Sequence, residues 1–110
     1  METIRVLIVD DHPIVRQGVR SVLANHADIE VVGEAEGAAS LFANLATLKP
    51  DVVLLDIRMP GQNGIEITQR LKREHPEVKV ILLSTYDDEE FLFGALRAGA
   101  VKMVIVKQRF

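Results

Sequence analysis

Short apolar runs alternate with amphipathic segments along the whole chain. The run Val52–Leu55 has four successive apolar residues, which is typical of a strand buried on both faces, as in a parallel sheet. Similar runs predict four more strands. We expect the strands over 4–9, 29–33, 52–56, 78–83 and 103–106.

Apolar residues recur at helical spacing between these runs. Pro13 suits the first position of a helix, and Asn25-His26 is expected to end that helix. Further helices are predicted over 38–48 and 65–74, each followed closely by a proline. Four acids from Asp87 open a fourth helix that ends near Gly99.

Strands that alternate with helices imply right-handed crossovers and a parallel sheet with helices on both of its faces. The chain has 110 residues and shows neither an internal repeat nor a linker. We therefore expect a single α/β domain over residues 1–110, long enough to bury a core without disulfides.

Composition narrows the classes of function. The net charge is −3 without a basic stripe, so nothing indicates direct binding of nucleic acid. The chain has no cysteine, which excludes disulfides and thiolate metal sites and suits a reducing cytoplasm. The start at Met1 lacks the pattern of a signal peptide, and the longest uncharged stretch, 37–48, is too short to span a bilayer. We expect a cytoplasmic protein that does not enter the membrane.

Three of the predicted strands end in oxygen-bearing side chains. They are followed or closed by Asp10-Asp11, Asp56 and Ser84-Thr85. Because the carboxyl ends of parallel strands lie at one edge of the sheet, these side chains are expected to converge. Carboxylates held together repel each other, and a hard cation such as Mg²⁺ would neutralise them. Beside such a cation, Asp56 is a credible nucleophile that can form an aspartyl phosphate.

Each of these signals also has a purely structural interpretation. The Asp10-Asp11 pair alone suits a turn that caps a helix, and Ser84 alone suits a strand end. His12, beside the acids, is either a metal ligand or a solvated turn residue, and the sequence favours the turn residue. The pattern of acids at matching strand ends favours a functional site for the carboxylates.

Several motifs occur together in one order and spacing. They are Asp10-Asp11, the strand 52–56, Met59-Pro60-Gly61 with Gly64, Ser84, and Ala98-Gly99-Ala100. With them the chain resembles the receiver domain of two-component response regulators, most of all the branch with a C-terminal helix-turn-helix effector. The resemblance implies a flavodoxin-like, doubly wound sheet of five parallel strands in the order 2-1-3-4-5.

The resemblance also implies a role for each acid. Asp56 would accept a phosphoryl group from the phosphohistidine of a histidine kinase. Asp11 and Asp56 would ligate Mg²⁺ directly, Asp10 through water, and Arg58 through its backbone carbonyl. The domain would be a signalling module rather than an enzyme. Its output would be transcription regulation through a DNA-binding domain outside this sequence.

Three further residues receive roles from the same resemblance. Ser84 would hydrogen-bond the aspartyl phosphate and draw the next loop inward, and Thr85 would offer its backbone N–H to a phosphate oxygen. Lys107 would pair with the phosphoryl group. Receivers carry that lysine seven residues after the glycine that corresponds to Gly99, whereas Lys107 comes eight residues after it. Because strand side chains alternate, this slip turns Lys107 to the other face unless a bulge restores it.

The sequence ends at Phe110, where receivers begin a fifth helix. We expect the domain to be truncated before that helix and to expose apolar surface along the fifth strand. The resemblance then implies a homodimer, or an exchange of elements between protomers, through the fourth helix and the fifth strand.

Other function classes remain open. One is a receiver-like interaction domain that no longer switches, because its lysine and last helix are altered. Another is a Mg²⁺-dependent phosphohydrolase with an aspartate nucleophile, which needs a second acid two residues later; Arg58 and His12 stand at those positions after Asp56 and Asp10. A flavin or nucleotide binder is the weakest alternative, because no glycine-rich loop follows the first strand.

Overall fold

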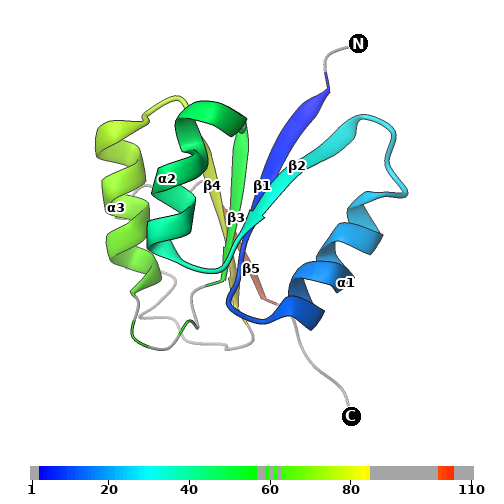
Figure 1. Cartoon of the computed structure of the whole chain (residues 1–110), viewed down its shortest axis with the longest axis horizontal. Coiled ribbons are helices and arrows are strands. Elements are labelled where there is room, and N and C mark those ends of the chain that lie inside the picture. Colours follow the sequence, from blue (N-terminus) through cyan, green and yellow to red (C-terminus); the bar gives the residue numbers. More distant parts are fainter. Residues whose placement is uncertain (1–2, 57–58, 60, 62, 85–101, 106–110) are drawn as a thin grey trace.

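The chain forms a twisted parallel sheet with helices on both of its faces (Figure 1). The computed structural model describes residues 3–56, 59, 61, 63–84 and 102–105. The helix predicted from Asp87, the expected end before a fifth helix, and residues Arg58, Thr85 and Lys107 lie outside the described residues. Among the described helices, none is long and apolar enough to cross a membrane.

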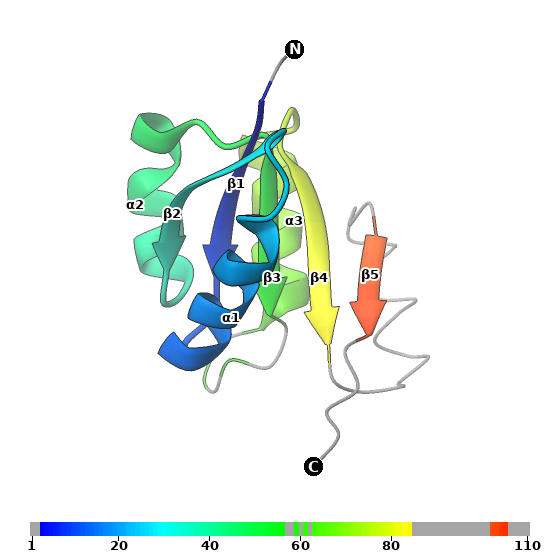
Figure 2. The ribbon, with the colours of Figure 1, turned by 90° about the vertical axis from the view of Figure 1, so that its right-hand side faces the viewer.

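The five strands confirm the predicted α/β fold and strand order. The strands are β1 (Ile4–Val9), β2 (Ile29–Ala35), β3 (Val52–Asp56), β4 (Lys79–Ser84) and β5 (Lys102–Ile105). They pair in parallel in the order β2-β1-β3-β4-β5, and Figure 2 shows them side by side in this order. Strand order reverses at β1, which pairs with both β2 and β3. The carboxyl ends of strands at such a reversal are where open α/β sheets bind ligands.

Three helices are described, and they lie on opposite faces of the sheet. The helices are α1 (Pro13–Leu23), α2 (Ala38–Leu48) and α3 (Gly64–Glu74). α1 lies on one face, and α2 and α3 lie on the other (Figures 1 and 2). A proline begins α1, as predicted, and the side chain of Asn63 caps α3 by accepting the N–H groups of Ile65 and Glu66.

The two faces of the sheet are buried to different extents. The side that α2 and α3 cover is the main core, where alternate residues such as Leu7, Val53 and Val80 are fully buried. On the α1 side, Ile8 is buried but the β3 residue Leu54 is only half-buried. α1 itself has no buried residue, and Ile14 is 83% exposed. The described residues therefore cover the apolar side of α1 only in part.

A bulge makes β2 longer than the sequence predicts. Val6 pairs with Val31, but the next residue, Leu7, pairs with Gly33, so one extra residue is inserted in β2. A Cβ on Gly33 would lie 2.7 Å from the Leu48 side chain, so glycine permits this close approach of α2. The predicted end of the strand at residue 33 is wrong, because here the glycine marks a bulge and pairing continues to Ala35.

Arg5 holds the end of α2. The helix ends at Lys49 in a left-handed conformation (φ 47°), which leaves its last carbonyls without helical partners. The Arg5 guanidinium donates to the carbonyl oxygen of Leu48 (2.7 Å) and to that of Lys49 (3.2 Å). A β1 side chain thus satisfies the helix end and supplies the cation that this end of the helix dipole favours.

Replacing Arg5 with methionine should lower the free energy of unfolding by about 1 kcal/mol, because two carbonyls at the end of α2 lose a charged donor. Urea unfolding followed by circular dichroism measures this change. Arg73→Met is the matched control, since Arg73 is an exposed arginine on α3, and its loss should cost less than about 0.5 kcal/mol. Equal effects of the two substitutions would contradict the role given to Arg5.

Candidate functional site

Acidic side chains converge at the carboxyl edge of the sheet, between β1 and β3. Val9 pairs with Leu55, so the residues that follow them, Asp10 directly after β1 and Asp56 at the end of β3, lie at the same level of neighbouring strands. Asp10, Asp11, His12 and Asp56 each offer one ligand atom, and these atoms all lie within 4.8 Å of one another. The predicted convergence of the three acids is confirmed.

Asp10 is the buried member of this cluster, with 2% of its surface exposed. Its backbone N–H donates to the carbonyl of Ala35 (3.0 Å), at the end of β2. Its carboxylate Oδ1 accepts the backbone N–H of His12 (2.8 Å) and lies 3.1 Å from the Nδ1 atom of the same residue. The two contacts from His12 stabilise a carboxylate that burial would otherwise penalise.

Asp11 carries an oxygen that is available to a cation. Its Oδ1 atom is buried and accepts no hydrogen bond from the part of the chain that the structure describes. His12 Nδ1 lies 2.8 Å from this oxygen, a separation that gives an ion pair when the imidazole is protonated. Among the described residues this oxygen accepts no hydrogen bond, and with the carboxylates of Asp10 and Asp56 it forms a set of oxygen ligands that fits a hard divalent cation.

His12 lies inside the cluster, although its side chain is 60% exposed. The sequence favours a solvated turn residue at this position, and the structure adds contacts to both Asp10 and Asp11. The signal in the sequence is an aspartate two residues before the histidine, because such an aspartate accepts the N–H at i+2 and folds the turn back on itself. His12 precedes the helix as its N-cap but makes no side-chain capping bond.

The other predicted residues are placed only in part. Ser84 ends β4, one residue past the Asp56–Leu83 pair, so its backbone lies at the same edge as the acids. Ser84 also pairs with Ile105 of β5, the last described residue before Lys107. Arg58, Thr85 and Lys107 themselves lie outside the described residues.

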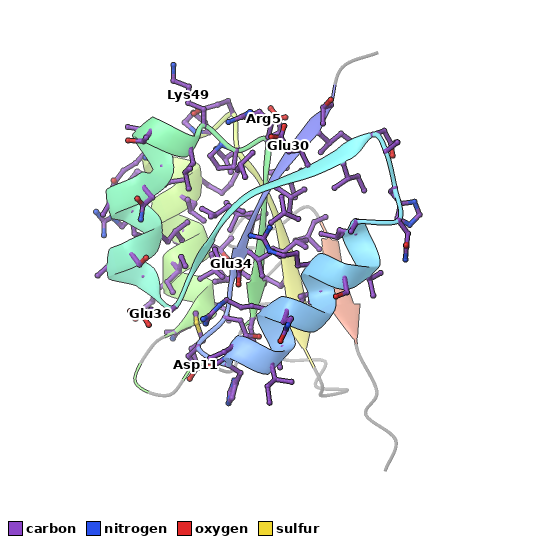
Figure 3. All side chains as sticks on the ribbon, turned by 45° about the vertical axis from the view of Figure 1, so that its right-hand side comes forward. Arg5, Asp11, Glu30, Glu34, Glu36 and Lys49 are labelled. Atoms are coloured by element: carbon purple, nitrogen blue, oxygen red, sulfur yellow. The ribbon has the colours of Figure 1, made fainter. Side chains whose placement is uncertain are left out.

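The described part of the site is therefore a cluster of three carboxylates and one imidazole that could hold a metal ion. It is built on a strand end, a turn and a neighbouring strand end, so rigid elements position most of its donors. Figure 3 shows Asp11 at the edge of the sheet where α1 begins. The cluster thus lies at the carboxyl edge of the sheet, next to the first residue of α1.

Comparisons with known proteins agree with this geometry. A family model described as the response regulator receiver domain matches residues 6–108. The response regulator GacA of Pseudomonas viridiflava is 43% identical over 97 residues, which are 88% of this chain and 45% of GacA. The response regulator protein VraR of Staphylococcus aureus is 39% identical over 94% of this chain and 49% of VraR. The chain thus spans about half the length of the curated relatives it matches.

Solved structures give the same match in three dimensions. The isolated REC domain of RcsB from Salmonella enterica serovar Typhimurium, determined in the presence of the phosphomimetic BeF₃⁻, has a TM-score of 0.90. It is 32% identical, and the alignment covers 98% of this chain and 80% of that domain. The signal receiver domain of a putative response regulator NarL from Mycobacterium tuberculosis has a TM-score of 0.87 and 34% identity over 96% of this chain and 85% of that one.

Asp11→Asn tests the crowding of charge in the cluster. The change removes one negative charge and keeps the shape of the side chain, so the metal-free variant should be more stable, by roughly 1 kcal/mol or about 4 °C in Tm. Added Mg²⁺ should raise the Tm of the wild type and leave that of the variant almost unchanged. Scanning calorimetry in EDTA and in Mg²⁺ measures both effects.

The matched control is Asp28→Asn, because Asp28 is an exposed acid before β2 and lies outside the cluster. Its loss should change neither the metal-free Tm nor the Mg²⁺-dependent rise by more than about 1 °C. A metal-free Asp11→Asn protein that is less stable than the wild type would show that the carboxylates do not repel one another enough to matter.

Proposed function

The chain belongs to the response regulator receiver domain family, and on that premise we propose that Asp56 accepts a phosphoryl group from the phosphohistidine of a histidine kinase. The observation that carries this proposal is the convergence of Asp56 with Asp10 and Asp11 within 4.8 Å. Asp56 ends a central strand and is half-buried. A nucleophile there is held in place and can still be reached from solvent.

The proposed reaction transfers one phosphoryl group between two side chains. A carboxylate oxygen of Asp56 attacks the phosphorus atom in line with the P–N bond of the phosphohistidine. The P–N bond breaks, its electron pair stays on the imidazole nitrogen, and an acyl phosphate remains on Asp56. Asp56 is suited to this role because the strand fixes its backbone before the donor arrives.

Mg²⁺ is the proposed cofactor. Asp11 and Asp56 would hold it directly, Asp10 through water, and Arg58 through its backbone carbonyl. When bound, the ion offsets the charge of the carboxylates and stabilises charge on the transferring group. The buried Oδ1 of Asp11, which accepts no hydrogen bond from the described residues, supports this assignment.

We further propose that residues at or just after the ends of β4 and β5 contact the phosphoryl group. Ser84 would donate its hydroxyl to a phosphate oxygen, Thr85 would donate its backbone N–H, and Lys107 would supply the counter-charge. The place of Ser84 at the end of β4, directly after Leu83, which pairs with Asp56, supports the first assignment.

The output is proposed from the relatives. The chain spans about half of GacA and VraR, so we propose that a longer protein carries a DNA-binding domain and regulates transcription in the cytoplasm. The receiver domain itself would not touch DNA. It would act through the fourth helix and the fifth strand, as a homodimer or by an exchange of elements between protomers.

A second candidate is a receiver-like interaction domain that no longer switches. The observation that favours it is the position of Lys107, eight residues after Gly99 and three residues after Val104, which pairs with Leu83, the partner of Asp56. Side chains alternate along a strand, so a lysine at this spacing has the wrong parity for the phosphate unless a bulge intervenes.

Intact-mass spectrometry after incubation with acetyl phosphate distinguishes the two candidates. A switching receiver should gain one phosphoryl group in Mg²⁺ and none in EDTA, and Asp56→Asn should abolish the gain because the amide is a poor nucleophile. Asp28→Asn, an exposed acid distant from the cluster, should be modified like the wild type. A folded protein that binds Mg²⁺ and gains no phosphoryl group would favour the interaction domain.

A further inference from the structure

Arg16 of α1 contacts both the edge strand β2 and the turn of residues 10–12 between β1 and α1, called the acidic turn below. Its Nε atom donates to Glu34 Oε1 (3.0 Å), and one terminal nitrogen donates to the backbone carbonyl of Asp10. The Arg16 side chain is only 17% exposed, which is unusual for an arginine of a helix that has no buried residue. The side chain is therefore held against the sheet by two different acceptors.

The bond to Asp10 acts on the backbone of the acidic turn. The carbonyl of Asp10 belongs to the planar peptide that ends at the Cα atom of Asp11, so fixing the carbonyl fixes the position of Asp11. The peptide on the other side of Asp10 is fixed as well, because its N–H donates to Ala35. Arg16 and Ala35 thus hold both peptides that flank Asp10.

Glu34 keeps Arg16 in this position and binds a second arginine. Arg20, one helical turn after Arg16, donates to Glu34 Oε2 (3.0 Å) and is 45% exposed. Figure 3 shows Glu34 between the sheet and α1, toward the end of the sheet where Asp11 lies. Both arginines share the carboxylate, but among the described contacts only Arg16 also reaches the acidic turn.

We propose that Arg16 is a positioning residue of the cation site. Through the carbonyl of Asp10 it holds the turn in the conformation that aims Asp10 and Asp11 at the cation. This proposal rests on the proposed function for the identity of the ligand, a hard divalent cation. An ion pair with Glu34 alone would have a different consequence: it would contribute modestly to stability and leave the affinity for the cation unchanged.

Two matched variants separate these roles. Arg16→Met removes the bonds to both Glu34 and Asp10, whereas Arg20→Met removes a bond to Glu34 and leaves Asp10 untouched. Binding of Mn²⁺, measured by electron paramagnetic resonance, should weaken about tenfold in Arg16→Met, the range found when groups that orient metal ligands are removed. In Arg20→Met the Kd should change less than about twofold.

Arg16→Gln is the second variant in case methionine disturbs the packing of α1. Its side chain is too short to hold Glu34 and Asp10 together, so its Kd for Mn²⁺ should also rise about tenfold. Circular dichroism checks that each variant is folded. Wild-type affinity in a folded Arg16 variant would overturn the proposal, and so would an equal loss of affinity in Arg20→Met.

A measurement without metal tests the positioning itself. The N–H of His12 is bonded to the Asp10 carboxylate, so its hydrogen exchange reports the order of the turn. By NMR, this exchange should be about tenfold faster in Arg16→Met than in Arg20→Met; equal rates would overturn the proposal. If the wild type bound no Mn²⁺, the proposed function would fail, while the exchange rates would still decide the role of Arg16.

Discussion

The structure depends on one constraint, the parallel register between β1 and β3. Pairing Val9 with Leu55 brings the following aspartates to neighbouring strand ends, where strands lie about 4.8 Å apart. Carboxylates so close repel; the backbone N–H of His12 donates to the Asp10 carboxylate, and the Asp10 N–H donates to the Ala35 carbonyl and fixes the backbone of the turn. The order of strands, the turn before α1 and the pairing of β2 all serve to hold this crowded edge together.

The sequence predicts the central part of this arrangement well. The bounds of β1 and β3 agree with the prediction residue by residue, because each strand contains a run of four apolar residues, Val6–Val9 and Val52–Leu55, with an aspartate directly after the run. Few topologies are possible when two such strands are joined by helices, and parallel pairing places the carboxyl ends of both strands at the same edge of the sheet. The cluster of Asp10, Asp11 and Asp56 was therefore predictable without any coordinates.

The contacts from β2 were not predictable in the same way. Strict alternation from Val31 puts Glu34 on the opposite face of the sheet, away from α1. The bulge reverses this parity, so Glu34 pairs with Ile8 and faces the arginines of the helix. Gly33, at the bulge, lies close to the Leu48 side chain of α2, and no local pattern of residues records that contact. The position of His12 within the cluster likewise depends on a turn whose direction is set by Asp10.

The unequal cover of the two faces has a consequence for how the domain responds to salt. α2 and α3 are attached to the sheet by buried apolar side chains, which carry no charge that electrolyte could screen. α1 has no buried residue, and its described attachments include the ion pairs of Arg16 and Arg20 with Glu34. Partly exposed pairs of this kind are screened by electrolyte. Salt should therefore weaken the attachment of α1, and through Arg16 it should also loosen the turn that carries Asp10 and Asp11.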